Sequence, residues 1–246
     1  MRKKKSVMFK ILKIFFTMFL SLTLAAAAVF ALWGYNMHRL AVEKVPPAEM
    51  AKMLRGENFV TMDELPRFYI DAVISAEDKR FYSHYGVDPK AIVRAVAHDI
   101  KAMSPEQGGS TITQQLAKNF YYDQEKRLER KFAEMFTAAA IEKELSKDEI
   151  FELYVNSIYF GDGYYGIYDA AEGYYGKLPS ELNDYECAML AGIPNAPSVY
   201  SPTENPKLAK ERMKQVLDCM AECGKITEEQ EENILNAKVS EAGDKR

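Results

Sequence analysis

A pair of carboxylates closes an apolar run in the stretch AEDKRFYSHYG, residues 76–86. If residues 70–84 are helical, Glu77, Phe81 and His84 fall at i, i+4 and i+7 on one face of the helix. A carboxylate at the end of an apolar helix, beside aromatic rings, is partly removed from water, and this makes it a stronger base. The alternative is a surface ion pair with a neighbouring cation, which is the commoner role of an isolated Glu-Asp pair.

A second group of polar side chains follows two glycines in GGSTITQQLAK, residues 108–118. A helix start of this kind offers free backbone N–H groups and hydroxyls to an anion. It is not a P-loop, because G-x-x-x-x-G-K-[ST] does not occur. A Gly-Gly-Ser start is by itself more often a simple helix cap. Two adjoining faces of this predicted helix carry Ser110, Gln114 and Lys118, and Thr111, Gln115 and Lys118.

A third group lies in EKRLERKFAEMF, residues 125–136. Lys126, Arg130 and Glu134 are spaced by four, so a basic row ends at a carboxylate on one helix face. Such a row is usually a solvated face with weak ion pairs. Taken with the other two groups, it completes a set of two glutamates, a hydroxyl and amide cradle and several cations. That set fits the displacement of a pyrophosphate from a sugar.

Helices are the elements that must position these groups, and strands are scarce, so the fold is predicted to be mainly α. Asp88 caps a helix begun by Pro89, and Ser146 with Glu149 forms a capping box. The segment 91–103 is either a core helix with one wet face or a lip that lies on the membrane. Residues 161–179 are predicted as loop, short helix and small hairpin. The other predicted helices span residues 66–84, stopped by Gly86, then 110–122, 128–145, 148–160, 183–193, 205–223, stopped by Gly224, and 228–237, capped by Thr227.

The N-terminus carries the signature of a membrane span. No charged residue occurs from Ile14 to Met37, and about 20 apolar residues suffice to cross a bilayer. The basic cluster before this run predicts a cytoplasmic N-terminus and an extracytoplasmic body. A cleaved signal peptide is the alternative, although the run is long for one. The predicted divisions are 1–13 basic segment, 14–37 transmembrane helix, 38–64 juxtamembrane stem, 65–240 catalytic domain and 241–246 polar tail.

Composition argues against a nucleic-acid partner and against a metal site. The chain has 246 residues, 48% of them hydrophobic, which is enough for a sizeable core. Residues 1–13 carry six basic residues and no acid, so the net charge of −4 leaves −10 for residues 14–246. An acidic body of this kind argues against a nucleic-acid partner. Cys187, Cys219 and Cys223 lack disulfide or zinc spacing, and core packing is the expected role of the last two. The three histidines form no H-x-x-x-H pair, so no metal cage is expected.

Several segments, taken in order, resemble the successive motifs of the peptidoglycan glycosyltransferases, glycosyltransferase family 51. The segments are EDKRFYSHYG, GGSTITQQLAKN, RKFAE, KDEIFELYVNSIYFGDGYYGIYDAAEGYYGK and LAGIPNAPSVYSP. The likeness runs from about Leu65 to Leu217. It implies a lysozyme-like helical domain after the single membrane helix. It also implies polymerisation of lipid II outside the membrane, by inversion to a β-1,4 bond with release of undecaprenyl pyrophosphate.

The resemblance implies a role for each matching residue. Glu77 would take the proton of the acceptor hydroxyl, while Glu134 matches the family's second glutamate, at the donor pyrophosphate. Glu134 would orient the cations, hold a divalent ion such as Mg²⁺ or Mn²⁺, or do both, and no organic cofactor is implied. Implied partners are lipid II, the growing lipid-linked glycan, the membrane and proteins of cell-wall synthesis or division. The matching substrate-binding positions are Asp78, Phe81, His84, Gly86, Ser110, Thr111, Gln114, Gln115, Lys118, Asn119, Lys126, Arg130 and Lys131.

One departure from the family pattern, one absent motif and two rival functions complete the prediction. Ala133 stands where many family members have lysine, so one pyrophosphate contact is expected to be missing or to be supplied from elsewhere. No serine precedes lysine by three, the spacing of penicillin-binding transpeptidases, so a monofunctional polymerase that does not bind β-lactams is expected. A lysozyme-like hydrolase or lytic transglycosylase would need an acid for the leaving sugar rather than cations. A non-catalytic membrane scaffold would tolerate loss of Glu77.

Overall fold

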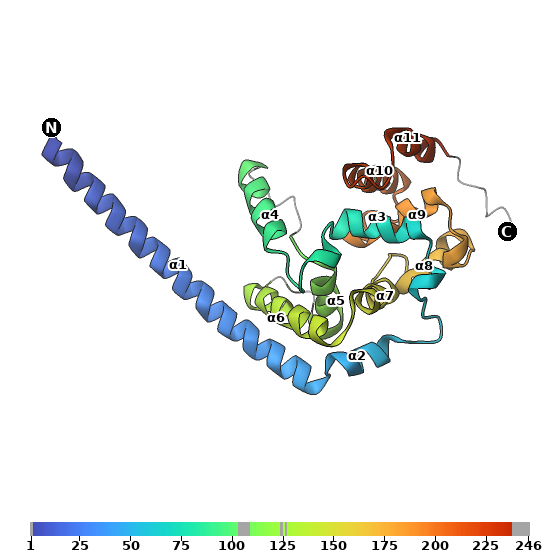
Figure 1. The fold of residues 1–246 in the computed structure, drawn as a ribbon, viewed down its shortest axis with the longest axis horizontal. Coiled ribbons are helices and arrows are strands. Elements are labelled where there is room, and N and C mark those ends of the chain that lie inside the picture. Colours follow the sequence, from blue (N-terminus) through green and yellow to red (C-terminus); the bar gives the residue numbers. More distant parts are fainter. Residues whose placement is uncertain (1, 103–108, 124, 126, 238–246) are drawn as a thin grey trace.

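The computed structural model describes residues 2–102, 109–123, 125 and 127–237, and this part of the chain folds almost entirely into helices (Figure 1). It contains no strand, only isolated bridges between Tyr85 and Val87 and between Tyr159 and Tyr165. The mainly α prediction is confirmed. The α-helices are α1 (Arg2–Lys44), α2 (Pro47–Leu54), α3 (Arg67–Glu77), α4 (Pro89–Ala102), α5 (Ile112–Tyr121), α6 (Leu128–Glu144), α7 (Lys147–Ser157), α8 (Gly166–Tyr175), α9 (Asp184–Gly192), α10 (Pro206–Glu222) and α11 (Glu228–Asn236). Short 3-10 turns lie at Met62–Glu64, Phe81–Ser83, Pro179–Glu181 and Ile193–Asn195.

Helix α1 extends far beyond the body of the protein (Figure 1). Met8–Lys44 is long and apolar enough to cross a membrane by length and composition, and its 18-residue apolar window is 0% buried. The only tryptophan of the chain, Trp33, is 59% exposed near the far end of the apolar surface. The next residue, Gly34, is buried. The helix therefore passes within two residues from an open apolar surface to a contact with the body.

The segment predicted as a juxtamembrane stem, 38–64, lies against the body. Helix α1 continues to Lys44, and the Pro46-Pro47 pair separates it from α2. Met50 is 0% exposed and Val60 is 5% exposed, and both belong to the main hydrophobic core. The predicted polar tail, 241–246, lies outside the described residues.

The centre of the core is α9, which is buried nearly all round. Its capping box, Asn183 with Glu186, starts the helix, and small or apolar side chains then let α3 and α10 pack closely on it. Cys187 is fully buried there, and none of the three cysteines forms a disulfide. Helix α7 contributes Phe151 and Tyr154 to the same core, both 0% exposed.

The sequence prediction was wrong for the segment 66–84, where α3 ends at Glu77. The carboxylate of Asp78 accepts a hydrogen bond from the backbone N–H of Ile112 at 3.1 Å, and this contact turns the chain away from the helix axis. Phe81 then enters the core at 0% exposure, within a 3-10 turn. Glu77, Phe81 and His84 therefore do not share a helical face, and Gly86 does not stop α3.

Other local predictions agree with the structure. Asp88 accepts the N–H groups of Lys90 and Ala91 at the start of α4, and the Ser146 and Thr227 caps are formed. Helix α5 starts at Ile112, two residues later than expected, because Thr111 is its N-cap. On α4, Val93 is 69% exposed and Ala95 is 7% exposed, so its apolar side chains do not all face the core.

Gly86 provides a test of how tightly the body is packed. Its φ is +74°, and an added Cβ would lie 2.8 Å from the backbone carbon of Ala138 on α6. Gly176 also has positive φ, at +63°, but an added Cβ there would meet nothing within 4 Å. We expect Gly176→Ala to lower the free energy of unfolding by about 1 kcal/mol, through backbone strain alone. Gly86→Ala should lower it by about 2 kcal/mol more, because overpacking is added.

Urea denaturation of both variants in detergent, followed by circular dichroism, measures this difference. Equal losses of stability in the two variants would show that α6 yields to the added methyl group.

Candidate active site

Glu77 is the last residue of α3, and its side chain is only 9% exposed. Its Oε2 accepts a hydrogen bond of 2.7 Å from Nε2 of Gln115 on α5. Its Oε1 is buried without a hydrogen-bond partner, and Nη2 of Arg212 lies 3.6 Å from it. A buried carboxylate with one oxygen held and the other still able to accept a proton is suited to act as a base.

Gln115 is held in turn from the core. The hydroxyl of Tyr154 donates to Oε1 of Gln115 at 3.3 Å, so the amide is fixed at both ends. Tyr154 is completely buried, and this burial raises its pKa well above the ordinary value, so the phenol stays protonated and continues to donate. The orientation of Glu77 therefore rests on a chain of two hydrogen bonds that starts in the core.

Arg212 of α10 was missed by the sequence analysis. Its guanidinium lies 3.6 Å from Glu77, over the ring of Tyr200, and its Nε donates to the Gly192 carbonyl at 3.4 Å. A signal was present, because Arg212 shares a helix face with the buried residues Ala209 and Val216. A cation on an apolar stripe needs an anionic partner, but the identity of that partner depends on the tertiary fold.

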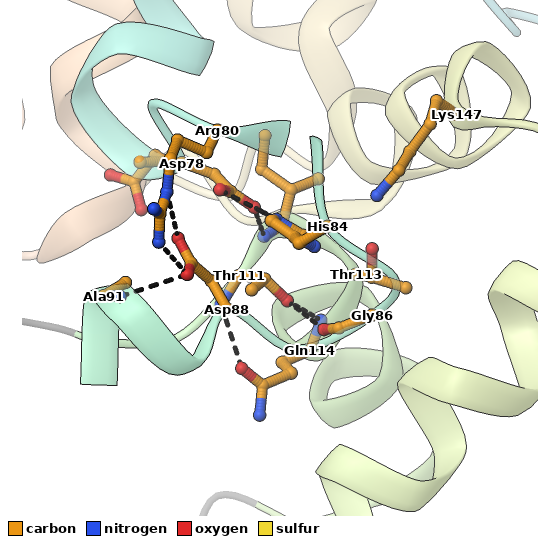
Figure 2. Close-up of polar contacts among 12 residues, drawn as sticks. Asp78, Arg80, His84, Gly86, Asp88, Ala91, Thr111, Thr113, Gln114 and Lys147 are labelled. Carbon is orange, nitrogen blue, oxygen red and sulfur yellow. Dashed lines mark hydrogen bonds and ion pairs between the residues drawn. The ribbon is translucent and has the colours of Figure 1, made fainter. Parts of the chain in front are cut away.

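The junction between the end of α3 and the start of α5 is held by polar contacts around Asp78 (Figure 2). The carboxylate of Asp78 is hydrogen-bonded to Nε2 of His84 at 2.9 Å and also accepts a hydrogen bond from the N–H of Ile112. Thr111 donates to the carbonyl of Gly86 at 2.6 Å, and Phe81 lies under Nζ of Lys147 at 4.5 Å from its ring centre. Each of these side chains makes its contact within the protein. Together these contacts hold the end of α3 against the start of α5.

Thr111 and Gln114 likewise bond within the protein. Each is 1% exposed, and they form a reciprocal capping box at the start of α5. The next residues along the helix differ, since Gln115 and Lys118 are partly exposed and Asn119 is exposed. Of the predicted substrate-binding residues that lie within α5, these three are open to a ligand.

Helix α6 carries the buried carboxylate of Glu134, which is 1% exposed. Nη1 of Arg130 pairs with Oε1, and Nζ of Lys131 donates to Oε2 at 2.8 Å. The same Lys131 ammonium donates to Oγ of Ser110 at 2.6 Å, so α6 is tied to the segment that leads into α5. Lys126, the first member of the predicted basic row, lies outside the described residues.

Lys118 interacts electrostatically with both glutamates. Burial lowers its pKa from the ordinary value and the charge of Glu134 opposes that shift. The charges of Arg130 and Lys131 lower the pKa further, and the charge of Glu77 raises it. An ammonium in such a place is incompletely compensated by its surroundings. It is therefore a favourable contact for an anionic group of a ligand.

A groove of about 430 Å³ runs beside α5. The walls are formed by Gln115, Lys118, Asn119, Ser157, Ile158, Tyr159, Tyr165, Pro194, Asn195 and Pro197. Gln115 therefore forms part of the groove wall and also holds Glu77, while Lys118 brings a cation to the same groove.

The divalent ion implied at Glu134 was tested against the donor set. Both oxygens of Glu134 already bond to cationic side chains, and the described residues contain no cluster of three or more His, Cys, Asp or Glu suited to a metal. A divalent ion bound by Glu134 would have to displace Arg130 or Lys131. These residues do not fit a metal ion held by protein ligands.

Known proteins are similar to this chain over most of its length. The transglycosylase family profile matches residues 47–221. Penicillin-binding protein 1A of Neisseria flavescens is 49% identical over 177 residues, which cover 72% of this chain and 22% of that protein. Its counterpart from Aquifex aeolicus is 46% identical over 178 residues, which cover 72% of this chain and 24% of the relative. The chain thus spans about a quarter or less of the length of these curated relatives.

The crystal structure of penicillin-binding protein 1A from Haemophilus influenzae aligns with 74% of this chain and 17% of that one, at 24% identity and a TM-score of 0.45. The family profile, in contrast, covers well over half of the chain and includes Glu77, Lys118, Glu134 and Arg212. From the extent of that match and the identity with the curated relatives, this chain belongs to the transglycosylase family, the peptidoglycan glycosyltransferases of family 51.

Proposed function

We propose that this protein polymerises lipid II into β-1,4-linked glycan strands by inverting glycosyl transfer, with release of undecaprenyl pyrophosphate. The observation that carries the proposal is that α5 serves two functions along one groove. Gln115 holds the buried carboxylate of Glu77, and Lys118, less than one turn later, lines the same groove and interacts electrostatically with Glu77 and with the cluster of Arg130, Lys131 and Glu134.

Glu77 is proposed as the general base. A sugar hydroxyl is too weak an acid to ionise before it reacts, so proton removal and attack on C1 of the donor sugar occur together. General-base assistance of this kind is worth roughly 10²- to 10⁴-fold in rate. The bond to the pyrophosphate oxygen breaks as the new glycosidic bond forms, and the acceptor proton passes to Glu77.

The cations are proposed to stabilise the leaving group. Negative charge grows on the pyrophosphate as its bond to C1 breaks, and fixed ammonium and guanidinium groups stabilise that charge without further rearrangement. Glu134 holds Arg130 and Lys131 in place through its two oxygens. The burial of Ala133, at 0% exposure, leaves no open surface at that position for another basic side chain. Among the described residues, the proposed contacts therefore come from Lys118, Arg130 and Lys131.

The membrane topology is proposed from the charge pattern. The basic N-terminal segment keeps that end in the cytoplasm, and α1 spans the bilayer, so the body works on the outer face where lipid-linked donor is presented. A divalent ion bound together with the pyrophosphate remains a prediction from the resemblance. Addition of EDTA to the polymerisation assay tests it.

Replacement of the base tests the central step. Glu77→Gln keeps the size of the side chain but removes the proton acceptor, and we expect glycan formation from purified lipid II to fall at least about 10²-fold. Glu222→Gln, at an exposed carboxylate of α10, is the matched control and should keep the wild-type rate. Gel analysis of the polymer, with circular dichroism to verify folding, measures both. Substantial polymer from the Glu77 variant would refute the base assignment, and degradation of preformed glycan would favour a hydrolase.

Removal of the groove cation tests the leaving-group contact. Lys118→Ala should lower kcat/KM for lipid II by on the order of 10²- to 10³-fold, the usual cost of losing one stabilising group in an active site. Lys52→Ala, whose side chain is 76% exposed on α2, should behave as wild type. The two variants are compared in the same steady-state assay. A wild-type rate for Lys118→Ala would remove the pyrophosphate role of this residue.

Arg212 gives a prediction that the sequence alone did not provide. Arg212→Gln leaves the buried Oε1 of Glu77 without its nearest cation, so the base loses its fixed position and kcat should fall more than about tenfold. Lys214→Gln, two residues further along α10 and 55% exposed, is the control. Initial rates at saturating lipid II decide the matter. Equal rates for the two variants would show that Gln115 alone positions Glu77.

A further inference from the structure

The membrane helix makes an unusually close contact with the helix that carries the cation cluster. Figure 1 shows the C-terminal part of α1 alongside α6. A Cβ added to Gly34 would lie 2.5 Å from Cβ of Phe132, 2.7 Å from the carbonyl oxygen of Glu129 and 2.8 Å from the backbone N of Ala133. Ordinary contacts of a Cβ are 3.4–4 Å. Only glycine therefore lets the two helices come this close.

The contact is specific beyond the glycine. Tyr35 packs edge-on against Phe136 with ring centres 5.5 Å apart. One turn later, Nδ1 of His38 lies 3.0 Å from Oγ1 of Thr137, and the hydroxyl of Tyr122 lies 2.6 Å from the same oxygen. Since Tyr122 is the C-cap of α5, Thr137 joins α1, α5 and α6 in one hydrogen-bonded junction.

The position of this junction relates it to the proposed chemistry. Phe132 and Ala133 lie between Lys131 and Glu134 in the sequence, and Thr137 is one turn beyond Glu134. The uncharged run of α1 ends at Met37, about one turn beyond Gly34, and Trp33 beside Gly34 is exposed. At 1.5 Å per residue, the 24 uncharged residues 14–37 span about 36 Å, slightly more than the roughly 30 Å of bilayer hydrocarbon. Gly34 therefore meets α6 at the outer boundary of the membrane.

We propose that Gly34 and the Thr137 junction form a docking contact that fixes the cation cluster of α6 at the depth of a membrane-embedded diphosphate. These are positioning residues, because they act through Arg130, Lys131 and Glu134. The proposal rests on the function proposed above. It goes beyond that function because it assigns the membrane helix a role in the geometry of the site, in addition to anchoring.

Gly34→Ala is the direct test, with Gly56→Ala as the matched control because a Cβ at Gly56 meets nothing within 4 Å. Helix propensity alone predicts that alanine strengthens α1, so a loss of activity would oppose that trend. The added methyl group forces α1 and α6 apart by about 1 Å, and a misplacement of that size can cost on the order of 10²-fold.

Polymerisation by the full chain is measured with lipid II in the same bilayer and with lipid II in detergent micelles, where the substrate can adjust its position. The rate in vesicles relative to the rate in detergent should fall roughly tenfold in Gly34→Ala and stay unchanged in Gly56→Ala. General destabilisation would lower both rates together. Thr137→Val, which removes the shared hydrogen-bond partner without adding bulk, should change the ratio in the same direction.

Hydrogen–deuterium exchange provides a second measurement that needs no activity. Amides of residues 128–137 should exchange faster in Gly34→Ala than in the wild-type protein or in Gly56→Ala. An unchanged vesicle-to-detergent ratio in Gly34→Ala, with or without faster exchange, would overturn the positioning role. Absence of polymer from the wild-type protein in both media would instead overturn the proposed function, and the exchange result would then decide by itself whether α1 docks on α6.

Discussion

The carboxylate of Asp78 joins the end of α3 to the beginning of α5, and the geometry of the site depends on this joint. Glu77 immediately precedes Asp78, while Gln115 and Lys118 follow Ile112 by one and two turns of α5. If the joint moved, the proposed base Glu77 and the groove would separate. The His84–Asp78 contact and the Thr111–Gly86 hydrogen bond support this joint. The segments EDKRFYSHYG and GGSTITQQLAKN are therefore held together as one rigid part of the structure (Figure 2).

Three buried glutamates in the body each pair with a cationic side chain. Glu134 pairs with Arg130 and Lys131, Glu142 with Lys147, and Glu186 with Lys177. Removal of one partner from such a pair typically costs about 3–5 kcal/mol, because a charge is left in a poorly solvated place. Glu77 differs, since one of its oxygens has no hydrogen bond and its nearest cation is 3.6 Å away. This incomplete pairing separates a carboxylate that can react from those that hold the fold together.

The sequence predicted most of the helices because their ends are encoded locally. Proline at Pro89, and capping boxes at Ser146, Asn183 and Thr227, act within one turn and need no distant partner. The end of α3 could not be predicted in this way. It is set by a hydrogen bond between residues 78 and 112, and 34 positions separate the two partners.

The site shows the same division between local and distant signals. Glu77, Lys118 and Glu134 could be found from motif spacing, whereas the partnership of Arg212 with Glu77 crosses 135 positions and depends on how α10 packs. The burial of Ala133 follows from the approach of α1, which no local pattern specifies. Residue types were therefore predictable, but the contacts that give them their function were set by helix packing.

The solitary indole of this chain has a practical consequence. Trp33 stands at the one turn where α1 leaves the apolar surface and reaches α6, and the protein has no other tryptophan. Intrinsic fluorescence excited at the indole band therefore reports on a single place without any added label. Its emission wavelength, and its quenching by lipids brominated at known depths, give the vertical placement of the whole protein in a bilayer.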